Sequence, residues 1–411
     1  MRISPFAALR PQPELAARVA AVPYDVVNTE EARRLAEGNP LSFLHVSRSE
    51  IDLPANTNPY SDAVYQRALS NLRWLEREAL LREAAPSTYV YRQETTLLGK
   101  AVRQTSLVCC GHVEEYESGI IKRHEKTRRD KEDDRTRHVL TLKTNAGPVF
   151  LMYRDRPSID QRIEREASSA PLYDFVAPDG VRHQVWRCVN AQPFVNEFAN
   201  VDVSYIADGH HRAASAARAG KELRASNPRH DGSERYNWFL CALFPASQLT
   251  ILPYHRVVKD LGGLSPAGLI EKLKQVGTVA LTSNPEPAAP GSFCVYVQKQ
   301  WYQVSFAPHS IDADDPVGSL DYSLLGDRVL GPILSIGDIR SDQRIDFVGG
   351  IRGPGELVQR VDSGRDAVAF SMHATTIEHL LRVADAGQIM PPKSTWFEPK
   401  LRSGLLLHSL D

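Results

Sequence analysis

Apolar residues recur along the chain in two patterns, one alternating with polar residues and one repeating with the period of a helix. The first pattern is typical of half-buried strands and the second of amphipathic helices. The predicted strands span residues 43–46, 88–96, 101–115, 149–153, 183–189, 201–206, 236–244 and 249–258. The predicted helices span residues 29–37, 61–83, 158–167 and about 209–220. Strands and helices mixed in this way predict an α+β fold.

A pair of glycines, Gly262 and Gly263, marks a predicted domain boundary. Beyond it the sequence predicts helices and a β-hairpin, at residues 266–276, 293–298, 301–306, 322–330 and 374–386. We therefore expect an N-terminal region, residues 1–85, that packs on a core of residues 86–260. A C-terminal α+β domain of residues 261–411 is expected to follow.

The composition is that of an ordinary globular protein, with 42% of the 411 residues hydrophobic, 24% charged and a formal net charge of −1. Dedicated nucleic-acid binders carry a positive excess, so this balance argues against that class. No apolar run has the length of a membrane span and the first residues lack a signal core, so we expect a cytoplasmic protein. The five cysteines form no Cys-x-x-Cys pair and are expected to be buried free thiols.

The densest group of ionisable residues is the run Asp208-Gly209-His210-His211-Arg212, between a predicted strand and a predicted helix. We expect Asp208 to cap the helix and Gly209 to let the backbone turn. The first N–H groups of the helix and its dipole would then face the same point as Arg212, with the two histidine rings beside them. This arrangement predicts an anion site, with phosphate as the best-suited anion. The alternative is a well-capped helix whose polar residues are only solvated.

A second charged run extends over residues 122–137. It is open to two interpretations, a solvated surface or part of a site. Glu125 lies between Lys122, Arg123, His124 and Lys126, which should keep its carboxylate ionised and available as a base. Thr127 and Arg135 could add a hydroxyl and a guanidinium to a phosphate site.

Several familiar motifs are absent. There is no Gly-x-x-x-x-Gly-Lys-Ser/Thr loop, no Gly-x-Gly-x-x-Gly after a strand and no Gly-x-Ser-x-Gly elbow. His124-Glu125 does not start a zinc protease motif, because Arg128 occupies the position of the second histidine. The sequence therefore excludes the P-loop, dinucleotide-fingerprint and serine-hydrolase signatures.

Near the C-terminus, Lys393, Ser394, Thr395 and Lys400 lie among three prolines. They are predicted to form a rigid loop that offers donors to an anion, and a structural clasp is an equal alternative. Pro23-Tyr24-Asp25 is a proline-locked turn for which a structural role is favoured.

Together these segments resemble the ParB/sulfiredoxin-like superfamily and, within it, the free-serine kinases, which share the Asp-Gly-His-His-Arg turn. The chain as a whole resembles the bacterial and archaeal DUF1015 family. The motifs that carry the resemblance are Ser4-Pro5-Phe6, Pro23-Tyr24-Asp25, His124-Glu125-x-Thr127, Asp134-Arg135, Gly147-Pro148-Val149-Phe150, Ala207 to Arg212, and Met390-Pro391 to Lys400.

The resemblance implies a ParB/sulfiredoxin-like mixed-sheet core with large insertions that binds a nucleotide. It implies a phosphotransferase that uses ATP or ADP with Mg²⁺, most of all a kinase that makes O-phosphoserine from free L-serine. Glu125 would activate the acceptor hydroxyl, and Asp208, His210, His211 and Arg212 would hold the phosphates, with Asp208 also a candidate catalytic residue and Mg²⁺ ligand. Residues 154–207 form an insertion that the small serine kinases lack, so the residues that recognise the acceptor do not carry over.

The main alternative is a non-catalytic nucleotide switch, like the CTP-binding ParB branch, that acts through a partner. A redox enzyme like sulfiredoxin is disfavoured because no cysteine lies beside the 208–212 turn in the sequence. The acceptor, the choice among ATP, ADP and CTP, and a homo-oligomeric state are left open.

Overall fold

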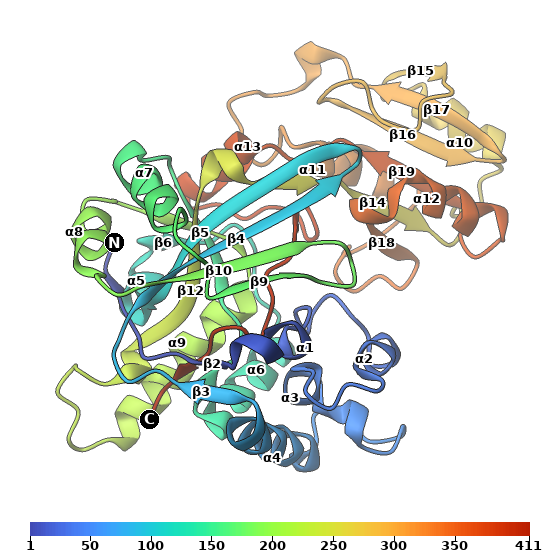
Figure 1. The fold of residues 1–411 in the computed structure, drawn as a ribbon. Helices are drawn as coiled ribbons and strands as arrows, with labels where there is room; N and C mark the ends of the chain where they lie inside the picture. The colour runs from blue at the N-terminus through green and yellow to red at the C-terminus, as the bar shows by residue number, and fades with distance from the viewer. The chain divides into compact units, whose positions relative to one another are not determined.

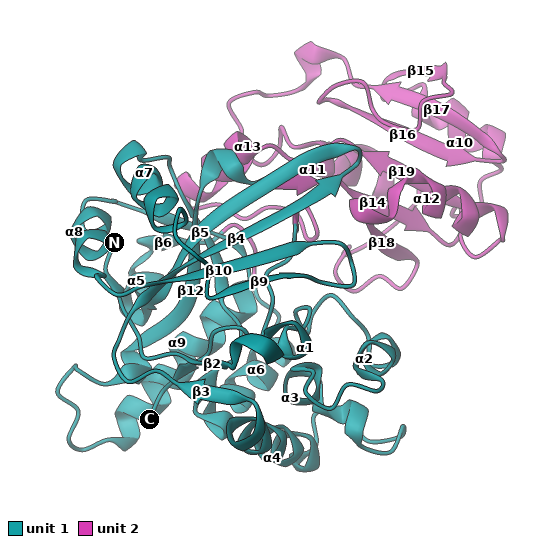
Figure 2. Ribbon diagram, in the orientation of Figure 1, with its two compact units in different colours: residues 1–123, 127–249, 399–411 teal, residues 124–126, 250–398 magenta.

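The computed structural model describes residues 1–411 and divides into two compact units (Figure 2). Unit 1 comprises residues 1–123, 127–249 and 399–411, and unit 2 comprises residues 124–126 and 250–398. None of the helices combines the length and the apolar character needed to cross a membrane. The three-part division expected from the sequence stays a prediction.

A mixed sheet of nine strands forms the centre of unit 1 (Figure 1). Its strands are β1 (Ile3–Ser4), β4 (Thr88–Leu97), β5 (Lys100–His112), β6 (Ile121–Lys122), β8 (Val149–Tyr153), β9 (Tyr173–Val176), β10 (Arg182–Cys188), β11 (Ser204–Asp208) and β12 (Trp238–Pro245). Eight of them run in the order β6-β11-β8-β12-β5-β4-β10-β9, and β1 pairs with β5. The pairs β6–β11 and β8–β12 are parallel and the other pairs are antiparallel.

Helices and short strand pairs surround this sheet. The helices of unit 1 are α1 (Ala16–Val19), α2 (Thr29–Ala36), α3 (Leu44–Ser47), α4 (Asp62–Glu78), α5 (Val113–Ser118), α6 (Arg129–Leu142), α7 (Pro157–Glu166), α8 (Gln192–Phe198) and α9 (His210–Ser226). The two-stranded pairs are β2 (Leu9–Pro11) with β3 (Leu80–Arg82), and β7 (Thr144–Asn145) with β21 (His408–Ser409).

Three apolar clusters hold these elements of unit 1 together, and the two largest fix its helices. The alanines of α9 share one cluster with the strands of the sheet, and their small side chains let this helix lie close to it. Helices α2, α3 and α4 form a second cluster with Leu142 of α6 and Leu407 (Figure 1). Helices α6 and α9 also pack against each other. The start of α9 is thereby fixed by both the sheet and α6.

Unit 2 is built on a six-stranded antiparallel sheet. Its strands are β14 (Tyr254–Val258), β15 (Thr278–Leu281), β16 (Ser292–Val297), β17 (Gln300–Ser305), β18 (Ile345–Gly349) and β19 (Val368–Met372), in the order β15-β17-β16-β19-β14-β18. The helices are α10 (Pro266–Leu273), α11 (Asp321–Leu325), α12 (Gly353–Asp362) and α13 (Ile377–Asp385), and β13 (Thr250–Leu252) pairs with β20 (Trp396–Glu398).

The strands β14, β16 and β19 of this second sheet are buried on both faces. Val258 and Phe370 belong to one apolar cluster, whereas their chain neighbours Val257 and Ala369 belong to another. Successive residues of a strand point to opposite faces, so each cluster covers one face.

The α+β prediction is confirmed, and four local predictions need correction. The strand expected over 101–115 ends at His112, and helix α5 begins at Val113. Residues 43–46 form no strand, because Leu44, His45 and Val46 lie in helix α3. The helix expected over 61–83 ends at Glu78, where the chain extends into β3. The strand expected over 249–258 is divided at Pro253, which lies between β13 and β14. Short apolar runs fit a buried helix or a buried strand equally well, so their tertiary surroundings decide.

Candidate functional site: the turn between β11 and α9

The turn after β11 contains the glycine that the sequence singled out. Gly209 adopts φ +92° and ψ +31°, in the left-handed region that favours glycine, and α9 begins at the next residue. The N–H of Ala213 donates to the carbonyl of Gly209 at 2.9 Å, which closes the first turn of the helix. No side chain caps this helix end. The first N–H groups of α9 and the positive end of its dipole therefore mark a point suited to an anion.

Asp208 does not cap α9 as predicted, because Gly209 occupies the N-cap position. One carboxylate oxygen of Asp208, Oδ1, accepts the N–H of Gly209 at 2.7 Å, and the other, Oδ2, accepts Lys400 Nζ at 2.9 Å. Burial alone would raise the pKa of this carboxyl group. The Lys400 ammonium and the Arg212 guanidinium outweigh burial and hold its pKa well below the usual range. Asp208 is therefore ionised at neutral pH.

The same contacts bear on whether Asp208 fits Mg²⁺. Both of its oxygens already accept hydrogen bonds, one of them from an ammonium, and Arg212 Nη2 lies 3.8 Å from Oδ1. A carboxylate neutralised by two cations is a poor partner for a hard divalent cation, which takes oxygen ligands. The residue as it stands does not fit a metal ligand, and its role in Mg²⁺ binding stays a prediction.

Arg212 folds back over the turn. A Cβ added at Gly209 would lie 2.9 Å from Arg212 Nε and 3.0 Å from Cζ. The guanidinium therefore occupies space that a side chain at position 209 would fill. Arg212 Nη1 donates to the carbonyl of Pro148, and Nη2 lies 3.9 Å from Asp25 Oδ2. The buried Nε has no hydrogen-bond partner. Burial disfavours the charge, but Asp25 and Asp208 raise the pKa of Arg212 above its usual value.

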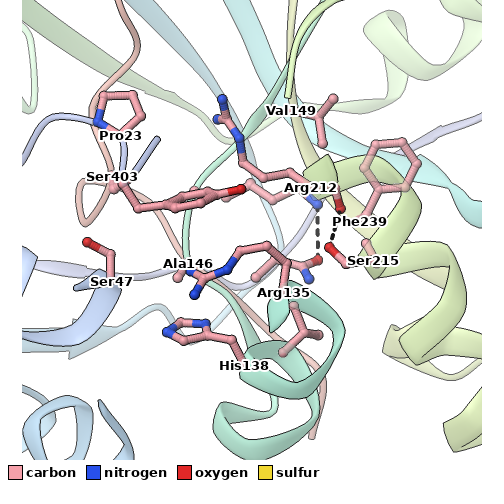
Figure 3. Close-up of a pocket in the computed structure, with 16 residues that line it drawn as sticks. Pro23, Ser47, Arg135, His138, Ala146, Val149, Arg212, Ser215, Phe239 and Ser403 are labelled. Atoms are coloured by element: carbon pink, nitrogen blue, oxygen red, sulfur yellow. Dashed lines mark hydrogen bonds between the residues drawn. The ribbon is translucent and has the colours of Figure 1, made fainter. Parts of the chain in front are cut away.

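A cavity of about 50 Å³ lies beside Arg212, within unit 1. Arg135 of α6 lines it as well, so the two arginines predicted to bind phosphate meet at one cavity (Figure 3). Its polar lining includes Tyr24, Ser47, His138, Asn145, Ser215 and Ser403. A cavity needs roughly 10–15 Å³ to hold one water molecule. This cavity therefore has room for a phosphate-sized group and not for a nucleoside.

Arg135 is held rigidly at this cavity. Its Nε donates to Asp134 Oδ2 at 2.8 Å, and its guanidinium carbon lies 4.3 Å from the ring centre of Tyr24. Tyr65 donates to the other oxygen of Asp134 at 2.8 Å. Burial would lower the pKa of Arg135, but Asp134 raises it above the usual value. The guanidinium is therefore charged, lies over the Tyr24 ring and is preorganised.

His138 lies one helical turn from Arg135 and also lines the cavity. Its Nε2 lies 3.0 Å from the carbonyl of Val46, to which it donates. Burial and the charge of Arg135 lower the pKa of His138 to about 4. The ring is therefore neutral at physiological pH.

The remaining predicted residues of unit 1 lie around the start of α9 and of α6. His210 is buried at the first position of α9. His211 Nε2 accepts the backbone N–H of Arg128 at 3.0 Å, which ties the turn to the start of α6. Thr127 Oγ1 donates to Glu132 Oε2 at 3.0 Å, so its hydroxyl proton is already engaged within this helix end.

Four predicted residues belong to unit 2, namely Glu125, Lys393, Ser394 and Thr395. Ser394 Oγ donates to the carbonyl of Pro391 at 2.7 Å, and Thr395 Oγ1 lies 3.3 Å from His124 Nε2. The structure therefore places Thr395 beside His124, the residue that precedes Glu125. That Glu125 faces the 208–212 turn stays a prediction, as does anion binding by Lys393, Ser394 and Thr395.

Sequence reasoning did not assign a site role to His138 or Tyr24. It expected Lys400 to offer a donor to an anion, whereas in the structure Lys400 forms an ion pair with the Asp208 carboxylate. Tyr24 lies in the noted turn Pro23-Tyr24-Asp25, which the sequence analysis interpreted as structural. His138 carried no signal, because it lies at an ordinary position of a helix.

Comparison with known proteins gives a family and a few distant likenesses. A family model described as "Protein of unknown function (DUF1015)" matches residues 3–323. No curated protein matches the chain. Solved structures that are similar to it include a free serine kinase in complex with AMP, with 11% identity, a TM-score of 0.35, and coverage of 73% of this chain and 91% of that chain.

Two further structures show comparable likeness. One is a conserved hypothetical protein from Pyrococcus furiosus, with 12% identity, a TM-score of 0.36, and coverage of 73% of this chain and 94% of that chain. The other is SbnI with a C-terminal truncation from Staphylococcus aureus, with 12% identity, a TM-score of 0.39, and coverage of 73% and 87%. Structural similarity at such low TM-scores does not indicate the function of this chain.

Proposed function

The chain belongs to the family described as a protein of unknown function (DUF1015), and we propose that it is a nucleotide-dependent phosphotransferase. In this proposal it transfers a phosphoryl group from ATP or ADP to a hydroxyl group of a small metabolite, with free L-serine as the leading acceptor. The core of unit 1 would be of the ParB/sulfiredoxin-like type.

The observation that carries the proposal is the convergence of cationic donors at the start of α9. The buried Arg212 Nε lacks a partner, and Arg212 shares its cavity with the stacked, charged Arg135. A phosphoryl group is an anion of a size that this cavity holds, and its oxygens would supply the missing acceptors. Donors that are fixed before the reaction stabilise charge that develops in a transition state without the cost of reorganisation.

The chemical step follows from these residues. The acceptor hydroxyl oxygen attacks the terminal phosphorus in line, a new P–O bond forms, and the P–O bond to the nucleotide breaks, which leaves ADP or AMP. Glu125 accepts the hydroxyl proton. Arg212, Arg135 and the first N–H groups of α9 bind the phosphoryl oxygens. Mg²⁺, when bound to the nucleotide, would offset phosphate charge.

The choice of L-serine comes only from the resemblance of the Asp-Gly-His-His-Arg turn to that of the free-serine kinases. A screen of nucleotides by thermal shift, followed by mass spectrometry of hydroxyl acceptors, identifies both substrates. The variant Glu125→Gln keeps the size of the side chain and removes the base. We expect it to abolish turnover while nucleotide binding, measured by calorimetry, changes little.

A Glu125→Gln variant with wild-type turnover would remove Glu125 from the mechanism. A wild-type protein that binds CTP or another nucleotide tightly but never turns it over would instead support the switch alternative.

A further inference from the structure

The short segment from His124 to Lys126 belongs to unit 2, although the residues on both sides of it belong to unit 1. Two contacts within unit 2 hold it. The N–H of Met390 donates to the carbonyl of His124 at 2.8 Å, and Thr395 Oγ1 lies 3.3 Å from His124 Nε2. The His124 side chain is 1% exposed, so it is enclosed as well as hydrogen-bonded. The residue before Glu125 is therefore anchored by both its backbone and its ring.

The loop that provides this anchor, residues 390–395, is itself internally fixed. Ser394 Oγ donates to the carbonyl of Pro391 at 2.7 Å, and Thr375 Oγ1 donates to the carbonyl of Ser394 at 2.7 Å. Lys393 adopts φ +58°, a conformation that side-chain-bearing residues rarely adopt without support from their surroundings. Such a loop holds one shape and can impose it on the segment it contacts.

Arg256 of β14 fixes the loop from the sheet of unit 2. It is 2% exposed, its Nη2 donates to the carbonyl of Pro392 at 3.1 Å, and its Nη1 donates to the carbonyl of Tyr254. Its guanidinium carbon lies 4.2 Å from the ring centre of Tyr322 and 5.3 Å from that of Phe347.

Burial lowers the pKa of Arg256 to about 10, so it remains charged at neutral pH. Its stabilising contacts are two carbonyl groups and two aromatic rings. Burying a charge costs free energy, which these contacts offset in part. The hydrogen bond to the Pro392 carbonyl ties the loop to β14.

We propose that the loop 390–395 is a clasp that sets the position of Glu125, with Thr395 and Arg256 as positioning residues. This inference rests on the proposed function, in which Glu125 is the base. It assigns the hydroxyl groups of Ser394 and Thr395 to the clasp rather than to an anion. A base displaced by about 1 Å loses up to roughly 100-fold in rate, so the geometry of the clasp should appear in kcat.

The test compares Thr395→Val with Thr395→Ser. Valine keeps the shape and removes the hydroxyl group, whereas serine keeps the hydroxyl group. Thr278→Val is the matched control, because Thr278 is an exposed residue of β15 in the same unit. Hydrogen–deuterium exchange of the 121–128 peptide reports the anchoring directly, and steady-state kinetics report kcat and the KM for the nucleotide.

We expect Thr395→Val to increase exchange in the 121–128 peptide and to lower kcat by roughly 10- to 100-fold with an unchanged nucleotide KM. Thr395→Ser should restore both values, and Thr278→Val should change neither. Arg256→Lys keeps the charge but not the planar, two-carbonyl geometry, and it should increase exchange in the same peptide.

Unchanged exchange in Thr395→Val and Arg256→Lys would overturn the clasp. Increased exchange with a wild-type kcat would overturn its link to Glu125. If the wild-type protein shows no turnover at all, the proposed function fails, whereas the exchange experiment still decides whether the clasp exists.

Discussion

Replacing Gly209 with alanine is predicted to weaken nucleotide binding through a neighbouring side chain rather than through loss of the fold. The new methyl group would lie 2.9 Å from Arg212 Nε, closer than side-chain carbons approach other groups. The atoms it meets are the mobile end of an arginine, so the guanidinium moves away at little cost. The contact with a nucleotide phosphate that we propose for Arg212 would then be lost.

Two free energies enter the expected result. Alanine in the left-handed region costs about 1–2 kcal/mol of folding stability, because φ is +92° at this position. A lost charge-assisted hydrogen bond costs about 1.5–3 kcal/mol, which is roughly a 10- to 100-fold increase in Kd. The first effect acts on unfolding and the second on binding, so the two can be measured separately.

Gly119 offers a matched control. It has φ +81° at the end of α5, and a Cβ there meets no atom within 4 Å. Gly119→Ala should therefore lose the same stability in urea unfolding and keep the wild-type Kd in calorimetric titration with nucleotide. Gly209→Ala should lose both. If Gly209→Ala binds nucleotide as tightly as Gly119→Ala does, Arg212 does not hold the phosphate in the way we describe.

Three further predictions concern stability. Lys400→Met should destabilise the protein by about 2 kcal/mol, because it leaves the Asp208 carboxylate without its ammonium partner, and adding Asp208→Asn should recover most of this loss in urea unfolding. Since the pKa of Asp208 is lowered on folding, its stabilisation is complete above about pH 4 and is lost as the pH falls further. Burial lowers the pKa of His138 to about 4 in the folded protein. Below about pH 6.5 the unfolded chain binds a proton at this residue and the folded protein does not, so the folded state should lose about 2–3 kcal/mol of stability by pH 4.5. His138→Asn, which keeps a donor for the same carbonyl, should flatten this part of the pH dependence, and an unchanged slope would contradict the assignment to His138.

The elements that the sequence predicted well are those whose signal is local. The hairpin of β4 and β5 formed close to its expected bounds because two alternating runs flank Gly99, whose φ of +78° suits a tight turn. The turn at Gly209 was located for the same reason. Helix α3 was missed because the four-residue run Phe43 to Val46 is too short to define a period, and packing against α4 decided its conformation.

The candidate site was only partly predictable, because its contacts join distant parts of the sequence. Asp208 was expected to cap α9, but it pairs with Lys400, which no local pattern links to it. Tyr24 stacks on Arg135 from a turn that was interpreted as structural. Arg135 and Arg212 were identified separately from their residue types, and their shared cavity emerges only when α6 packs on α9.

The central claim is that this protein moves a phosphoryl group from a nucleotide to a small hydroxyl compound. Phosphorus NMR of the wild-type protein with ATP or ADP, Mg²⁺ and L-serine, repeated with Glu125→Gln, tests it most directly. We predict a phosphomonoester resonance that grows in step with the dephosphorylated nucleotide, requires the acceptor and is absent in the variant. Bound nucleotide that stays intact with serine and with every other hydroxyl acceptor in the screen would contradict the claim.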